Sequence, residues 1–389
     1  MKKIILTLCA LLIVGGALYL TLRNREEVPR ATVPFDFTPY ELKGRAVSLS
    51  VSETSLIDDH NFVAFSEDES GEQYVTWWRD YEIEQEANLQ KGYGNDAIIP
   101  RWDGACGILR YIADEERTME TGAMKWGQLM LYDFEQEGFV HERPIADGLL
   151  DWLLCRGGFA VLIQEDEGQF LNLYDGQGKL EARLPLSDAY HSVVRAQRDQ
   201  TGLWAVTLAS AGGRTYTFMT VRDGEIIWQS RPTMDTYTAR MDGRGGYFHL
   251  EYGGKYSDTY KPLIISHCDA AGNAEWNKTL TGDKVLLESV NARFDPETGH
   301  LILTGSAVAN SRKIYRVFRM EVDENWKTVS MDVRECNYHE SYHLVVAVSP
   351  LTCKTMVLAR AISDGYDIPA VLVPFDDLPK APNPGITLR

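Results

Sequence analysis

An aspartate ends an apolar run at seven places between Trp77 and Asp377, and turn residues usually follow it. Neighbouring markers lie 42 to 54 residues apart. A repeat of about fifty residues in a strand-rich chain indicates a radial architecture, with one four-stranded sheet, or blade, for each repeat. We therefore predict an all-β chain folded as a seven-bladed β-propeller. The markers are Asp80, Asp133, Asp175, Asp223, Asp269, Asp323 and Asp376.

The clearest repeat covers residues 189–231. Runs rich in β-branched and aromatic residues, bounded by turn residues, predict strands at 192–198, 203–210, 214–222 and 225–230. Asp223-Gly224 is a typical two-residue hairpin turn between the last two strands. The same pattern fits residues 234–281 and 285–334, so the repeat predicts four strands for each complete blade.

The two ends of the propeller region predict how the fold closes. The last repeat offers strands at 343–349, 355–362 and 369–375, and prolines 379, 382 and 384 then disfavour a fourth strand. Residues 32–37 form a strand-like segment without a hairpin partner. We expect this N-terminal segment to serve as the outer strand of the last blade, because that closure removes an exposed sheet edge.

The N-terminus predicts export. Residues 4–22 carry no charge, and as a helix they are long enough to cross a bilayer. We predict a signal anchor or signal peptide over 1–25, a linker over 26–31 and the propeller over 32–389. The favoured interpretation is a single-pass protein of the cell membrane with an extracytoplasmic C-terminal domain. The alternative is a secreted protein, since Gly15 and Ala17 could direct cleavage.

The charge balance excludes some partners. The whole chain has a formal net charge of −17, and beyond residue 30 there are 34 bases and 54 acids, a charge of about −20. Such a domain is unsuited to nucleic acid and to anionic lipid. We expect membrane contact through the N-terminal helix only, with an envelope protein or a glycan as partner. The plain alternative is that the acidic surface aids solubility.

Five cysteines lie beyond the N-terminal helix, and their spacing fits no metal motif. Each sits in or beside a strand-like run, so we interpret them as buried small hydrophobic residues. An odd number leaves at least one free thiol, and Cys336 with Cys353 is the first pair to test for a disulfide.

Three turns carry a family resemblance. The run from Asp269 through Gly272 to Trp276, the shorter run from Asp223 to Trp228, and Trp326 three residues after Asp323 resemble the quinoprotein-like propeller repeat, over about three of the seven blades. The resemblance implies a propeller fold and an extracytoplasmic setting, with the tryptophans filling the space between blades. It implies no quinone site here, because the sequence shows no paired cysteines and no dense cluster of Asp, Asn and Arg.

The residues that begin each inner strand form the predicted site. In a propeller these residues open onto the mouth of the central channel, where acids from several blades would converge. Such acids could bind a divalent cation, hold a cationic or sugar-like ligand against tyrosines, or act as an acid and base pair. The alternative is that they only accept backbone N–H groups in turns. The candidates are Asp96, Asp151, Asp188, Tyr190, His191, Asp235, Tyr237, Glu288, Glu340, Tyr342 and His343.

The run from His339 to His343 matches the letters of a zinc protease motif. That chemistry needs a helix, because only there do the two histidines share a face. A strand-like run, 344–348, follows instead, so we predict no metal site of this kind and name no catalytic residue.

The sequence thus favours a ligand-binding or scaffold module with its ligand at an acidic channel mouth. A glycan- or peptide-acting enzyme using the same carboxylates is the alternative.

Overall fold

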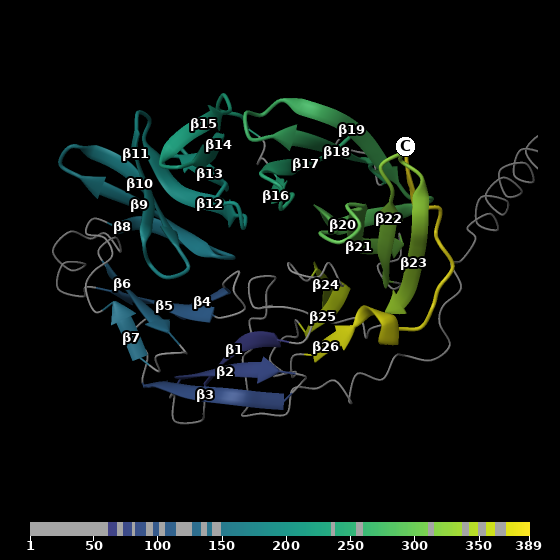
Figure 1. Cartoon of the computed structure of the whole chain (residues 1–389), viewed down its shortest axis with the longest axis horizontal. Helices are drawn as coiled ribbons and strands as arrows, with labels where there is room; N and C mark the ends of the chain where they lie inside the picture. The colour runs from purple at the N-terminus through teal and green to yellow at the C-terminus, as the bar shows by residue number, and fades with distance from the viewer. Residues whose placement is uncertain are drawn as a thin grey trace, which may run out of the picture. The chain divides into compact units, whose positions relative to one another are not determined.

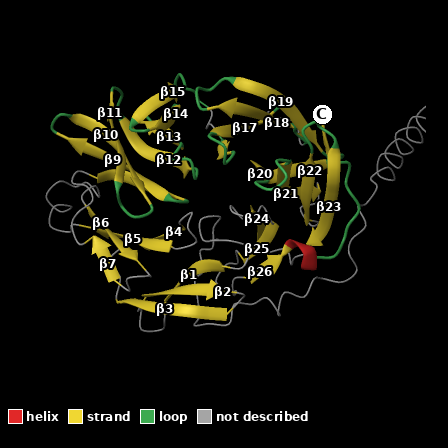
Figure 2. Ribbon diagram, viewed as in Figure 1, coloured by secondary structure: helices red, strands yellow, loops and turns green. Residues whose placement is uncertain are grey.

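The computed structural model describes residues 61–67, 73–79, 82–90, 96–100, 106–113, 127–133, 138–141, 149–234, 238–253, 260–309, 315–336, 342–348, 355–361 and 371–389. All of these lie in one compact unit, Phe35–Arg389. They form seven antiparallel sheets (Figure 1). The all-β prediction is confirmed: strands dominate this part of the chain, and the short 3-10 turn η3, Phe375–Asp377, is the helical segment visible in Figure 2.

The strands follow one another along the chain in groups of three or four. The first two sheets contain β1 (Asn61–Glu67), β2 (Gln73–Arg79) and β3 (Glu82–Gln90), and then β4 (Asp96–Pro100), β5 (Cys106–Ala113), β6 (Gly127–Asp133) and β7 (Gly138–His141). The next two contain β8 (Leu149–Cys155), β9 (Gly158–Glu165), β10 (Gly168–Asp175) and β11 (Leu180–Leu186), and then β12 (Tyr190–Arg198), β13 (Trp204–Ser210), β14 (Tyr216–Arg222) and β15 (Glu225–Gln229). The fifth contains β16 (Ala239–Met241), β17 (Gly246–Tyr252), β18 (Leu263–Asp269), β19 (Ala274–Thr281) and the C-terminal β27 (Thr387–Leu388). The last two contain β20 (Val285–Phe294), β21 (Leu301–Ala309), β22 (Tyr315–Val322) and β23 (Thr328–Cys336), and then β24 (Tyr342–Val348), β25 (Thr355–Ala361) and β26 (Val371–Pro374).

Each sheet is a meander whose strands pair in sequence order, apart from the added β27. Neighbouring sheets meet through their first strands: β4 contacts β8, β8 contacts β12, β12 contacts β16, β16 contacts β20, and β20 contacts β24. The first strands therefore lie side by side and the last strands lie at the sheet edges. This is the organisation of a β-propeller.

The sequence repeat is visible in the backbone. In six sheets the two strands on either side of the aspartate marker shift their pairing register within the three residues before that marker. A bulge at this point increases the twist of the outer strand. In the turn that follows, Oδ1 of Asp175 accepts the backbone N–H groups of Gln177 and Lys179, both at 2.9 Å. Asp323 holds its turn in the same way.

The Asp223-Gly224 hairpin prediction is also confirmed. The φ angles are 52° at Asp223 and 79° at Gly224, and Arg222 pairs with Glu225 across the turn. Positive φ at both central residues is what a type I′ hairpin requires, and Asp-Gly satisfies it at low cost.

The hydrophobic core lies in the seams between neighbouring sheets. Phe218 of β14 packs against Tyr247 of β17 with ring centroids 5.2 Å apart, and both are fully buried. The outer-strand tryptophans belong to these seams. A Cβ on Gly272, in the β18–β19 turn, would lie 2.6 Å from the Trp228 ring of β15, so the glycine makes room for the ring. Trp276 meets Trp326 at 4.5 Å in the next seam. The role predicted for the tryptophans is therefore confirmed in these two seams.

The last sheet has three described strands, as the sequence predicts, but the residues that follow differ from expectation. The C-terminal tail leaves η3, bonds with β23 at Val333 and Glu335, and then adds β27 to the edge of β19. Ile386 enters the core of the seam between the fifth and sixth sheets and is 1% exposed. After these prolines the described tail adds no fourth strand to the last sheet. It bonds instead with β23 and β19, which belong to the two preceding sheets.

Some predictions fall on residues that the structure does not describe: the N-terminal helix, the closing segment 32–37 and Cys353, the expected partner of Cys336. Within the described part of the chain, no helix has the length and apolar character needed to span a bilayer. Cys155 and Cys268 are buried free thiols, as the sequence predicts.

Candidate functional site

The predicted mouth residues coincide with irregularities in the first strands. Pairing with the second strand shifts between Leu149 and Asp151 in β8, between Tyr190 and Ser192 in β12, and between Glu288 and Asn291 in β20. Bulges break the ladder, re-aim side chains and occur often beside functional sites. In three sheets, the strand starts at which the sequence predicts site residues therefore also carry a break in strand pairing.

Asp151 connects two neighbouring sheets. Its Oδ2 accepts the backbone N–H of Val193 in β12 at 2.7 Å. Burial raises the pKa of Asp151, while the N–H groups of Val193 and Trp152 and the nearby His191 act in the opposite direction. Asp151 therefore has a structural role, and it is also a carboxyl group that binds a proton more readily than an exposed one.

The β12 candidates divide between the core and the surface. Tyr190 is buried and its hydroxyl lies 3.3 Å from Oγ1 of Thr217. His191, skipped by the bulge, is exposed and its Nδ1 lies 2.5 Å from the carbonyl oxygen of Ser210. Asp188 is exposed just before the strand and interacts with Tyr190. The structure thus brings Asp151, Asp188, Tyr190 and His191 to the start of two adjacent first strands.

The other candidates are placed less completely. Glu288 is exposed in β20, and its charge together with burial raises the pKa of Tyr252, with burial the larger cause. Asp96 begins β4, and Tyr342 and His343 begin β24, so the backbone puts all three at strand starts as predicted. Three candidates, Asp235, Tyr237 and Glu340, lie outside the described residues. Within the described residues, no three His, Cys, Asp or Glu side chains are arranged to hold a metal ion.

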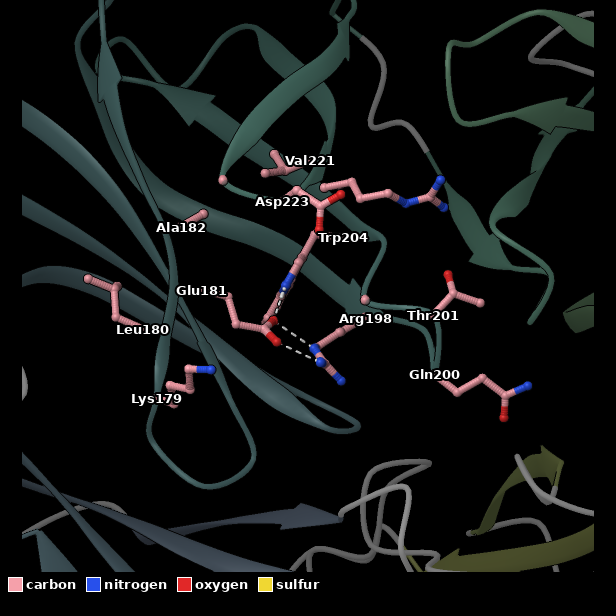
Figure 3. Close-up of a pocket in the computed structure, with 13 residues that line it drawn as sticks. Lys179, Leu180, Glu181, Ala182, Arg198, Gln200, Thr201, Trp204, Val221 and Asp223 are labelled. Carbon is pink, nitrogen blue, oxygen red and sulfur yellow. Dashed lines mark hydrogen bonds and ion pairs between the residues drawn. The ribbon is translucent and has the colours of Figure 1, made fainter.

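A pocket that the sequence did not indicate lies at the opposite end of β12. It has a volume of about 430 Å³ and is lined by the start of β11, the β12–β13 turn and the β14–β15 turn (Figure 3). It therefore opens at the seam between the third and fourth sheets. Asp188 and His191 lie at the other end of this strand, so the pocket is separate from the predicted mouth.

Three side chains form a fixed wall of the pocket. Arg198 donates from Nε and Nη2 to the two carboxylate oxygens of Glu181, at 2.8 and 2.7 Å, and Nε1 of Trp204 donates to Glu181 at 2.8 Å (Figure 3). Burial acts to raise the pKa of Glu181, but its hydrogen bonds from Arg198 and Trp204 outweigh burial and lower it. Glu181 and Arg198 therefore remain charged, and a bidentate pair of this kind keeps its geometry.

Sequence reasoning missed this pocket for a physical reason. Glu181 is the second residue of β11 and Arg198 the last of β12, which are unremarkable positions in two different repeats. Only the packing of the third sheet against the fourth brings them together. The nearby sequence signal is the Asp-Gln-Thr-Gly turn at 199–202. It indicates where a strand ends, but not which residues of the neighbouring blade lie against that turn.

Comparison with known proteins defines no family for this chain. No family model matches it, and no curated protein sequence matches it. Among solved structures, it is similar to a eukaryotic initiation factor (11% identity, TM-score 0.41, covering 86% of this chain and 80% of that one). It is also similar to oligopeptidase B from Trypanosoma brucei (10% identity, TM-score 0.43, covering 86% and 55%) and to the Dos1 propeller (13% identity, TM-score 0.33, covering 81% and 65%). This chain thus spans little more than half of the oligopeptidase, and TM-scores below 0.5 carry no functional argument.

Proposed function

We propose that this protein is a membrane-anchored, extracytoplasmic β-propeller that acts as a ligand-binding or scaffold module, with a ligand at the acidic mouth formed by the first strands. The observation that carries the proposal is the bulging of β8, β12 and β20 at Asp151, His191 and Glu288. A purely structural inner strand gains nothing from a broken ladder, whereas a binding site gains re-aimed side chains.

The rest of the fold supports a rigid module. Side chains join first strands across the seams: Asp151 to Val193, Gln197 to the backbone N–H of Met241, and Arg240 to Asn291. Such bonds fix neighbouring sheets against each other, and a binding surface built on them is preorganised.

Several finer features belong to the same proposal. We infer seven blades with segment 32–37 closing the last one, in the manner of the quinoprotein-like repeat. The anchor at 4–22 would hold the domain at the outer face of the cell membrane, where an envelope protein or a glycan is the partner we expect.

One observation favours an enzyme as the second candidate. Asp151 has a raised pKa and interacts with the exposed His191, and an acid and base pair needs one carboxyl group of this kind. Turnover on a panel of glycans and peptides would support the enzyme, and its absence together with ligand binding would support the binding module.

The test of the mouth is a triple substitution in the full-length protein, D188N/D235N/E340Q. If the acids hold the ligand, a ligand from a glycan and cation panel that raises the melting temperature of the wild type should have no effect on the variant. An unchanged shift would place the site elsewhere. Pull-down from detergent-solubilised membranes tests the scaffold form of the proposal. In that form, a partner protein should still bind the D188N/D235N/E340Q variant.

A further inference from the structure

The pocket between the third and fourth sheets differs in charge from the rest of the molecule. Its lining contains Lys179, Arg198 and Arg222 against Glu181 and Asp223, a local excess of one positive charge. The whole chain has a net charge of −17. A cationic cavity in an acidic protein concentrates the attraction for anions at one place.

The pairing inside the lining increases this excess. Glu181 is saturated, because both its oxygens accept from Arg198 and one also accepts from Trp204. Arg198 uses Nε and Nη2 for this pair and retains the donors of Nη1. Glu181 is thus neutralised in place, and it offers little to a ligand.

Two cations of the lining form no close ion pair with an acid among the described residues, although the charge of Lys179 acts on Glu181 and helps to lower its pKa. Lys179 is exposed, and it uses its backbone, not its ammonium, to bond with Asp175. Arg222 is half-buried, and the one hydrogen bond described for its guanidinium is a long one, 3.4 Å from Nη2 to the carbonyl oxygen of Gly245. Partly desolvated guanidinium groups with spare donors are typical binders of carboxylate and phosphate.

The remaining acid of the lining sets a second requirement. Asp223 is exposed at the β14–β15 turn and lies at the opposite end of the Trp204–Glu181–Arg198 wall from Lys179 (Figure 3). The lining is open at Gly202, where an added Cβ would meet nothing within 4 Å. A free carboxylate accepts hydrogen bonds from hydroxyl groups.

We propose that this pocket is a second binding site, for a small organic anion that carries a carboxylate or phosphate together with hydroxyl groups. The anionic group meets the cations of the lining, and the hydroxyl groups meet Asp223. The site is independent of the mouth, because the two lie at opposite ends of β12.

The experiment measures binding of three probes to the full-length protein in detergent by calorimetry: glucose 6-phosphate, glucuronate and glucose. The two charged probes distinguish phosphate from carboxylate, and glucose is the uncharged reference. The test variant is K179Q/R222Q, which keeps the Glu181–Arg198–Trp204 wall. The matched control is K327Q, because Lys327 occupies the same place in the turn after Asp323 that Lys179 occupies after Asp175.

We expect at least one charged probe to bind, glucose to bind at least about tenfold more weakly, and K179Q/R222Q to weaken the charged probe by about tenfold or more, as loss of charge-assisted hydrogen bonds implies. K327Q should bind like the wild type. Equal binding of glucose, an equal loss in K327Q, no loss in K179Q/R222Q or no binding of either charged probe would overturn the proposal. None of these results affects the mouth, which the D188N/D235N/E340Q variant tests separately.

Discussion

At the scale of single residues, a buried aspartate stabilises its turn through contacts that the sequence indicates only in part. Asp242 follows β16 directly and is 3% exposed. Its Oδ1 accepts the backbone N–H groups of Arg244 and Gly246, and its Oδ2 lies 2.8 Å from Nε2 of His267. The other ring nitrogen of His267 lies 2.8 Å from Glu275, so both nitrogens of this histidine face carboxylates. That arrangement joins the β16–β17 turn to β18 and β19 within the fifth sheet.

The Asp242→Asn variant should therefore be less stable, by about 2 to 3 kcal/mol in the free energy of unfolding. Burial acts to raise the pKa of Asp242, but bonds from His267, Arg244 and Gly246 outweigh it and hold the pKa below its ordinary value. A depressed folded-state pKa contributes stability above the unfolded pKa of about 4, and that contribution disappears as the pH falls through the folded value.

Urea unfolding at pH 7 and at decreasing pH below 4 measures this effect. The gap between the wild type and Asp242→Asn should narrow as the pH falls. Glu297→Gln, at an exposed turn position, is the control and should change stability little at any pH. A gap that is constant with pH would show that the ionised carboxylate of Asp242 is not what stabilises this part of the fifth sheet.

Gly272 allows a second test at the residue scale. Its φ is +78°, and a Cβ would lie 2.6 Å from the Trp228 ring, so Gly272→Ala combines backbone strain with a clash. We expect a loss of about 2 to 4 kcal/mol in urea unfolding. Gly212→Ala is the matched control, because nothing lies within 4 Å of its Cβ position, and it should be close to neutral. Equal effects of the two variants would contradict the role of Trp228 in the seam.

At the scale of elements, the C-terminal tail is the part that sequence patterns describe least well. The closely spaced prolines 379, 382 and 384 disfavour a strand, yet β27 pairs Thr387 with Thr281 and Leu388 with Leu280. Arg334 of β23 anchors the start of the tail through the carbonyl oxygens of Asp376 and Leu378, both at 2.9 Å. The tail therefore covers the outer edges of two sheets, which is one way to protect an exposed edge.

Ile386 is the apolar anchor of this tail. Ile386→Ala should lower the free energy of unfolding by about 2 to 4 kcal/mol, because it removes a fully buried side chain and leaves a cavity. Thr387→Ala, next to it and exposed, should cost less than about 1 kcal/mol. Hydrogen exchange of the β19 backbone amides measures the local effect: exchange should quicken in Ile386→Ala and stay unchanged in Thr387→Ala. Unchanged exchange in both would mean that the tail is dispensable for that edge.

At the scale of the whole molecule, we predict attachment to the membrane through residues 4–22. If residues 4–22 are an uncleaved anchor, the full-length chain should remain in the membrane pellet after carbonate extraction, and its mass should include Met1. A variant that begins at residue 26 should appear in the soluble fraction. A native mass that corresponds to cleavage after Ala17 would replace the anchor with secretion.

The period of the aspartate markers determined the fold class, because the residues that end and cap a hairpin are local in sequence. Asp175 and Asp323 hold turns whose partners lie two and four residues away, and such contacts are readable from spacing alone. The starts of the inner strands were readable for the same reason, and the structure places Asp151, Tyr190 and His191 there.

Contacts between repeats were decided by the tertiary structure. Glu181 meets Arg198 and Trp204, and Ile386 meets the core around Leu280, only because sheets pack through their seams and a terminal segment crosses two edges. No local sequence pattern encodes these contacts. Glu181 and Arg198 belong to two different blades, and Ile386 follows Leu280 by about a hundred residues of chain. Sequence periodicity therefore fixes the repeated unit, and the geometry of packing fixes the pocket.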